Sequence, residues 1–158
     1  MGGVNYGKLW EQKVMEDFSK LPGATIDRLH DLTTGFKTTS RNVADAIGYV
    51  FPLHFYIECK CCHGNTFPLS NYIQYDKMIH KVGIPGVRAG VILWWVDHKK
   101  VAYIPTATFS KLKEDGKKSV NIKMLSDGTY NIIEIPSETK RVFPKCDFTV
   151  LKSLSEGE

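Results

Sequence analysis

Residues 43–61 read Val-Ala-Asp-Ala-Ile-Gly-Tyr-Val-Phe-Pro-Leu-His-Phe-Tyr-Ile-Glu-Cys-Lys-Cys, and this stretch decides the fold. Two β-rich runs on either side of Phe51-Pro52 predict an antiparallel hairpin. A turn centred on that dipeptide sets Asp45 directly across from Glu58. Cross-strand neighbours on one face have Cβ atoms roughly 5 Å apart, so we expect the two carboxylates to lie together.

Side chains along the second run, 53–61, alternate between the two faces of a strand. The apolar and thiol side chains share one face, which we expect to pack on the core: Phe55, Ile57, Cys59 and Cys61. Glu58 and Lys60 share the opposite face, next to Asp45. Two adjacent carboxylates repel each other, and a hard divalent cation, Mg²⁺ or Mn²⁺, relieves the repulsion through oxygen ligation.

Lys60 is placed to orient an attacking water or to neutralise charge that develops on a phosphoryl oxygen. Together with Asp45 and Glu58 it therefore predicts a site for phosphodiester hydrolysis. The alternative interpretation is a solvated face that carries an ordinary Glu–Lys pair.

The chain before the hairpin predicts one helix, one strand and one loop. Apolar residues recur at helical spacing over 5–20, with Trp10, Val14, Met15, Phe18 and Leu21 as the inward set. Glu11 falls on this apolar stripe, and a charge there needs a reason. A short strand is expected over 24–30, and the polar run 31–42 is expected to be a surface loop.

After the hairpin, helix and strand patterns alternate. We expect a helix over 70–82, a buried central strand over 90–96, a strand ending at 104, a helix over 105–114, and a hairpin of 121–125 with 130–135. This mixture indicates an α/β fold with a sheet flanked by helices. We find no linker or repeat that would divide 1–158 into two domains.

The composition is that of one globular domain: 158 residues, 42% apolar and 24% charged. This excludes disorder and coiled coil. The longest apolar run, 91–96, is far shorter than the ~18 residues of a membrane helix, and no signal pattern opens the chain, so we expect a cytoplasmic protein. The net charge of +4 leans only slightly toward a polyanionic partner.

Three of the four cysteines fall within four positions, at Cys59, Cys61 and Cys62, and the fourth is Cys146. This spacing suits neither a disulfide nor a zinc knuckle, so reduced thiols are expected.

The segments Asp45–Tyr49 (DAIGY) and Ile57–Lys60 (IECK) resemble the D…E-x-K core of the PD-(D/E)xK nuclease superfamily. The continuation Asn65–Asn71 (NTFPLSN) is similar to RecU-like Holliday-junction resolvases, including phage-encoded relatives. The resemblance runs from about residue 7 to residue 105. It implies a restriction-endonuclease-like mixed β-sheet flanked by helices, with a core of about 5–105 and an extension, 106–158, packed on it.

Carried over by residue, the resemblance implies that Asp45, Glu58 and the backbone carbonyl of Cys59 ligate the metal while Lys60 assists the attacking water. Glu11 matches the first-helix glutamate that many superfamily members use near the metal. Gln74 is similar to a helix glutamine that follows the E-x-K strand in several branches, and we expect it to contact DNA. Three basic residues flank the strand that presents Asp45 and are further candidates for DNA contact: Arg28, Lys37 and Arg41.

Two departures accompany the resemblance. Ala44 stands where the superfamily name has proline, which leaves the ligands intact. The segment before Asp45 is short for the protruding stalk with which RecU-type enzymes engage a junction.

These features predict a Mg²⁺- or Mn²⁺-dependent endonuclease that resolves four-way DNA junctions by phosphodiester hydrolysis. From the resemblance we expect a homodimer on branched DNA, in the host cytoplasm if the protein is phage-encoded, with no membrane partner and no nucleotide cofactor. The alternatives are a nuclease for other branched or linear DNA, an inactive scaffold, or a non-catalytic DNA-binding module in which Cys59, Cys61, Cys62 and His63 hold zinc.

Overall fold

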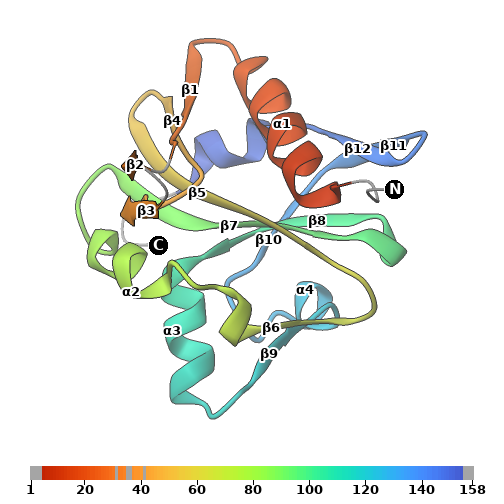
Figure 1. Ribbon diagram of the computed structural model, residues 1–158. Helices are drawn as coiled ribbons and strands as arrows, with labels where there is room; N and C mark the ends of the chain where they lie inside the picture. The colour runs from red at the N-terminus through yellow and green to blue at the C-terminus, as the bar shows by residue number, and fades with distance from the viewer. Residues whose placement is uncertain (1–4, 31, 35–36, 41, 155–158) are drawn as a thin grey trace.

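A six-stranded mixed sheet forms the centre of the computed structural model, which describes residues 5–30, 32–34, 37–40 and 42–154 (Figure 1). In spatial order its strands are β1 (Ala24–Arg28), β4 (Ala46–Val50), β5 (Leu53–Cys62), β7 (Val87–Trp95), β8 (Lys100–Pro105) and β10 (Ile133–Ile135). β5 and β7 run parallel, and the other neighbours are antiparallel. The predicted α/β class, with a mixed sheet flanked by helices, is confirmed.

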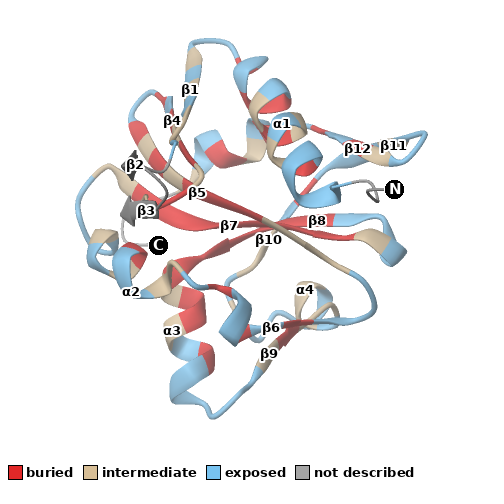
Figure 2. Cartoon of the chain, in the orientation of Figure 1, coloured by how far each residue is buried: buried red, intermediate tan, exposed pale blue. Residues whose placement is uncertain are grey.

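Helices cover both faces of this sheet. On one face, α1 (Tyr6–Ser19) packs Trp10, Val14 and Phe18 against the strands, and the C-terminal 3₁₀ segment η4 (Phe148–Ser153) adds to the same core. The other face is covered by α3 (Thr106–Glu114) and by a short helix, α2 (Tyr75–Met78). Figure 2 shows the buried middle of β5, β7 and β8 between these layers.

Three two-stranded sheets and several short turns complete the chain. The strand pairs are β2 (Leu32–Thr34) with β3 (Lys37–Ser40), β6 (Thr66–Pro68) with β9 (Ser119–Asn121), and β11 (Ser137–Lys140) with β12 (Phe143–Cys146). The short helical elements are η1 (Leu69–Asn71), η2 (Ile79–Lys81), η3 (Val96–His98) and α4 (Met124–Asp127). No helix in the described ranges is long and apolar enough to cross a membrane.

The hairpin register inferred from Phe51-Pro52 is confirmed. Val50 pairs with Leu53, and the ladder continues to Ala46 opposite Ile57. β5 then extends beyond β4, so its second half has β7 as its neighbour on one side and is open to other elements on the other side. This fork between β4 and β5 places the residues of the candidate site.

Three predicted elements are wrong. The run 31–42 is not a plain loop, because its described backbone forms the β2–β3 pair. The helix over 70–82 is broken into η1, α2 and η2, because Tyr72 leaves helical geometry (φ −88°, ψ 77°) to bury its ring. The 121–125 and 130–135 hairpin does not form: β9 pairs with β6, β10 pairs with β8, and α4 lies between them.

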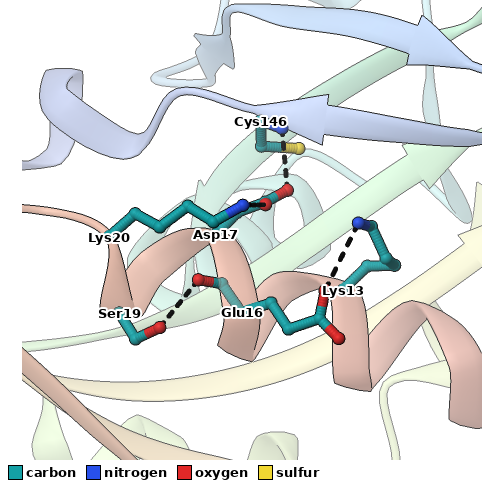
Figure 3. Close-up of polar contacts among 6 residues, drawn as sticks. All are labelled: Lys13, Glu16, Asp17, Ser19, Lys20 and Cys146. Atoms are coloured by element: carbon teal, nitrogen blue, oxygen red, sulfur yellow. Dashed lines mark hydrogen bonds and ion pairs between the residues drawn. The ribbon is translucent and has the colours of Figure 1, made fainter.

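Asp17 is a charged residue on the inward side of α1, three positions after Val14 and seven after Trp10, and it is only 3% exposed. Figure 3 shows the reason: its carboxylate accepts a hydrogen bond from the backbone N–H of Cys146 in β12 at 2.9 Å. Lys20 lies 3.4 Å from the other oxygen. The C-terminal segment therefore packs on α1 and supplies the hydrogen-bond donor that this buried carboxylate needs.

Gly90 in β7 allows β8 to pack closely, and its replacement is expected to destabilise the sheet. A Cβ atom at this position would lie 2.7 Å from the backbone oxygen of Ile104 and from the Tyr103 ring. We expect Gly90→Ala to lower the free energy of unfolding by about 2 kcal/mol, because backbone in a central strand cannot move aside freely. Urea unfolding checks this, with Gly7→Ala as a control, since the Cβ there would meet its nearest atom at 3.5 Å. An unchanged midpoint for Gly90→Ala contradicts the prediction.

Candidate active site

Asp45 is held beside the middle of β5 by two backbone hydrogen bonds. Its N–H donates to the Ile57 carbonyl oxygen at 3.0 Å, and its Oδ2 accepts from the Cys59 N–H at 2.8 Å. The carboxylate is thus fixed at the open end of β4, on the side where β5 continues. This is the position that the hairpin register predicts.

Glu58 is fully buried, at 0% exposure, and neither of its carboxylate oxygens has a hydrogen-bond partner. The alternative interpretation, a solvated face with an ordinary Glu–Lys pair, is therefore wrong for Glu58, because α2 and α3 cover this side of the sheet as well. Burial, followed by the neighbouring carboxyl of Asp45, raises the pKa of Glu58 to about 9. If both carboxyl groups were ionised, neither could donate a hydrogen bond to the other. When Glu58 holds a proton, its O–H can donate a hydrogen bond to Asp45.

Lys60 lies two residues farther along the same face of β5, with its Nζ 3.9 Å from Glu58 Oε2. Its side chain is about one-quarter exposed, so the ammonium group reaches solvent while the carboxylate does not. The positive charge of Lys60 lowers the pKa of Glu58, but this effect is smaller than those of burial and of Asp45. The ion pair therefore compensates the buried charge only in part.

Glu11 approaches the same site from α1, as its position on the apolar stripe suggests. Its Oε1 lies 3.3 Å from Nε of Arg28, the last residue of β1. Burial and the Asp45 carboxylate raise the pKa of Glu11, while Arg28 and Lys60 oppose the rise. Glu11, Asp45 and Glu58 thus form an electrostatically coupled group of acids, contributed by α1, the start of β4 and the middle of β5.

Two pockets open on this group and share three wall residues, Glu11, Arg28 and Asp45. The larger, about 510 Å³, lies toward the start of α1 and is also lined by Asn5, Gly7, Lys8, Cys59, Lys60 and Cys61. The smaller, about 230 Å³, is also lined by Leu29, His30, Asn42, Ala44 and Gln74. Glu11 and Asp45 therefore face both pockets, whereas the buried Glu58 lines neither of them.

The structure brings most of the predicted site residues together. Gln74 precedes α2 and lines the smaller pocket, where its buried Oε1 has no hydrogen-bond partner. Arg28 contacts Glu11, and Cys59 contributes its N–H to Asp45, while metal ligation by the Cys59 carbonyl stays a prediction. Arg41 and the side chain of Lys37 lie outside the described residues.

Sequence reasoning missed Asn5 and Lys8. Asn5 caps α1 by accepting the Lys8 N–H at 3.1 Å, and both residues line the larger pocket. Lys8 could have been predicted from the sequence, because it lies three positions before Glu11 and residues at this spacing are neighbours on a helix. The site therefore gains a cation and a helix N-terminus near its acids.

The carboxylates fit a hard divalent cation better than they fit zinc. No three His, Cys, Asp or Glu side chains in the described part of the chain gather closely enough to hold a metal alone. Mg²⁺ needs one or two protein carboxylates, with water and carbonyl oxygens as its other ligands, so Asp45 and the unpartnered Glu58 suffice. The residues of the alternative zinc site point in different directions. Cys59 and Cys61 pack in the core on one face of the sheet, Cys62 packs in the core on the other face, and His63 contacts Asp97 at 3.1 Å.

Comparisons with known proteins give likenesses to solved structures only. No known protein family matches the chain, and no curated protein sequence matches it. Among solved structures, Hjc from Archaeoglobus fulgidus, a Holliday junction resolvase from an archaeal hyperthermophile, is similar with a TM-score of 0.48 and 16% identity. The alignment covers 65% of this chain and 78% of that chain. At this identity and TM-score the likeness assigns no role to any residue.

Proposed function

We propose that this protein is a metal-dependent endonuclease that hydrolyses phosphodiester bonds in four-way DNA junctions. The observation that carries the proposal is Glu58, a buried carboxylate with no hydrogen-bond donor, placed beside Asp45 and 3.9 Å from Lys60. A buried carboxyl beside a second acid has to keep a proton or gain a cation, and a cation bound between Asp45 and Glu58 would neutralise both of them. The two pockets that Asp45 lines, one of which Lys60 also lines, give a substrate access to this site.

Asp45 and Glu58 would hold Mg²⁺ or Mn²⁺, with the Cys59 carbonyl as a further ligand. The bound cation would supply Lewis-acid stabilisation of phosphoryl charge and make water more acidic. Lys60 stabilises negative charge on a phosphoryl oxygen and helps to orient the attacking water. Water attacks phosphorus as the bond to the leaving oxygen breaks, one DNA end keeps the phosphate, and the other leaves as an alcohol after it gains a proton.

Glu11 is our candidate acceptor for the proton of the attacking water. Its raised pKa makes it a better base than an ordinary glutamate, and it lines both pockets beside Asp45. Arg28 then balances the charge of Glu11 until the proton arrives. This assignment separates the residues that hold the cation from the one that takes the proton.

The junction substrate and the homodimer follow from the resemblance of segments 45–49, 57–60 and 65–71 to RecU-like resolvases. A single chain offers one set of Asp45, Glu58 and Lys60, whereas resolution of a junction needs two cuts. We therefore propose a homodimer that acts on branched DNA in the cytoplasm, or in the host cytoplasm if the protein is phage-encoded.

The test compares four-way junction, flap and linear duplex DNA of equal length, each end-labelled, in Mg²⁺, Mn²⁺ or EDTA at one salt concentration. We expect cleavage of the junction in Mg²⁺ or Mn²⁺, loss of cleavage in EDTA, and two protomers by light scattering. Equal rates on linear duplex would favour a nuclease without junction selectivity. No cleavage of any DNA with either cation would contradict the proposed reaction.

A further inference from the structure

The net positive charge of the chain is concentrated on one part of its surface. The segments 75–81 and 106–118 carry Lys77, Lys81, Lys111, Lys113, Lys117 and Lys118 against Asp76, Glu114 and Asp115. This excess of three accounts for most of the formal charge of +4. Ion pairs occur inside and outside these segments, as in Lys111–Asp115, Lys13–Glu16 and Lys140–Glu138, so what distinguishes the two segments is their excess of positive charge.

Two of these lysines contact aromatic rings whose residues are close in sequence to Glu58 and Gln74. The Lys81 Nζ is 5.0 Å from the ring centre of Tyr56, which precedes Glu58 by two residues and so shares its face of β5. The Lys113 Nζ is 4.5 Å from the ring centre of Tyr75, the residue after Gln74. The positive surface therefore begins beside the two elements that carry Glu58 and Gln74.

The two lysine-bearing elements are fixed relative to each other by buried contacts. The ring of Tyr72, just before α2, packs edge-on against Phe109 of α3 at 4.7 Å between ring centres. Its hydroxyl shares a 2.8 Å hydrogen bond with Thr106 Oγ1, also in α3, and donates to the Met78 sulfur at 2.9 Å. Figure 1 shows α2 and α3 as neighbours on this face of the sheet.

We propose that the α2–α3 lysine surface, defined as Lys77, Lys81, Lys111, Lys113, Lys117 and Lys118, binds the sugar–phosphate backbone of a duplex DNA arm next to the cleaved bond. The proposal rests on the proposed function, because it takes the Glu58 site as the point of cleavage. Ammonium groups spread over two helical elements suit the phosphates of a duplex, and such contacts are independent of sequence.

A purely structural role explains only part of this surface. Lysines in the last turn of a helix stabilise its dipole, which accounts for Lys111 and Lys113 in α3. It does not account for Lys81, which reaches across from η2 to the Tyr56 ring on β5. The aromatic rings hold both ammonium groups in place before DNA arrives, which reduces the entropy lost on binding.

The test is a comparison of two double variants with the same change in charge. Lys81→Gln/Lys113→Gln removes two cations of the surface, and Lys145→Gln/Lys152→Gln removes two exposed cations from β12 and η4, which pack on the opposite face of the sheet. Binding of a fluorescein-labelled 30-bp duplex is measured by anisotropy in EDTA, which prevents cleavage, between 50 and 200 mM KCl. Thermal unfolding of each variant confirms that it is folded.

We expect Lys81→Gln/Lys113→Gln to weaken duplex binding about tenfold or more at 100 mM KCl. The dependence of its affinity on KCl concentration should fall by an amount that corresponds to about two phosphate contacts. The control pair should change affinity less than about twofold. No loss of duplex binding in the first double variant, or an equal loss in both double variants, would overturn the proposal. If the wild type cleaves DNA and Lys81→Gln/Lys113→Gln binds the duplex as tightly as the wild type, the proposed surface is wrong and the nuclease proposal stands. If Lys81→Gln/Lys113→Gln alone loses binding and the wild type cleaves no DNA, the nuclease proposal is wrong and the surface stands.

Discussion

Glu58→Gln is expected to lower the single-turnover rate of Mg²⁺-dependent junction cleavage at least ~10³-fold, which corresponds to about 4 kcal/mol of lost transition-state stabilisation. Glutamine has nearly the same shape, so the buried position stays filled, but it lacks the negative charge that would hold a cation. Asp45→Asn is expected to have an effect of similar size, because the amide oxygen still accepts the Cys59 N–H but carries no charge. Both rates are measured with saturating protein on a labelled junction.

The matched control for these variants is Glu134→Gln. Glu134 is an exposed residue of β10 that pairs with Lys100 at 3.4 Å, so this variant makes the same chemical change away from the site. We expect wild-type cleavage from Glu134→Gln, and DNA binding within about threefold of wild type from all three variants. Equal cleavage by Glu58→Gln and the wild type would show that the active site lies elsewhere.

The carboxylate pair was predictable because all of its determinants lie within one hairpin. The Phe51-Pro52 turn and the alternation of the flanking strands fix the register, and the register places Asp45 next to β5. Glu11 was predictable for a different local reason, since a charge on the apolar stripe of an amphipathic helix indicates a partner.

The burial of Glu58 could not be predicted, because it depends on segments distant in sequence. Strand alternation puts Glu58 opposite the apolar face, but it does not say that α2 and α3 pack there. The predicted helix over 70–82 breaks before Gln74 because the Tyr72 ring is buried, and this leaves the large apolar side chain of Ile73 62% exposed. Asp17 shows the same limit, since its partner in β12 is 129 residues away.

The stability of the metal-free protein is expected to fall as pH rises from 6 to 9, and Glu58 is the main cause. Its pKa is raised from 4.5 to about 9, so over this range the folded protein holds a proton that the unfolded chain releases. The contribution of this proton to the free energy of unfolding is fully present below about pH 4.5. It declines as the pH rises and is lost once the pH passes about 9. One proton corresponds to about 1.4 kcal/mol per pH unit, so we expect a loss on the order of 2–4 kcal/mol.

Urea unfolding in EDTA at pH 6, 7, 8 and 9 measures this loss, with Glu58→Gln as the variant that cannot titrate. The exposed carboxyls whose pKa values are lowered, such as Asp97 and Asp147, change protonation in acid and leave this window unaffected. Glu58→Gln should keep only the decline above about pH 8 that the thiols with raised pKa values cause in both proteins, and it should be more stable than the wild type at pH 9. Parallel curves for the two proteins would mean that Glu58 is ionised in the folded state and that another group offsets its charge.

Added Mg²⁺ should reverse this pH dependence, because a cation and a proton compete for the same carboxylates. At pH 8 we expect Mg²⁺ to raise the Tm of the wild type by several degrees and to leave Glu58→Gln almost unchanged. At pH 5 the stabilisation of the wild type should be much smaller, since the cation must then displace a firmly held proton. Ca²⁺ and K⁺ at matched ionic strength separate site binding from general screening. Equal stabilisation of both proteins at both pH values would place the cation elsewhere and remove the reason that we give for an unpartnered carboxylate at Glu58.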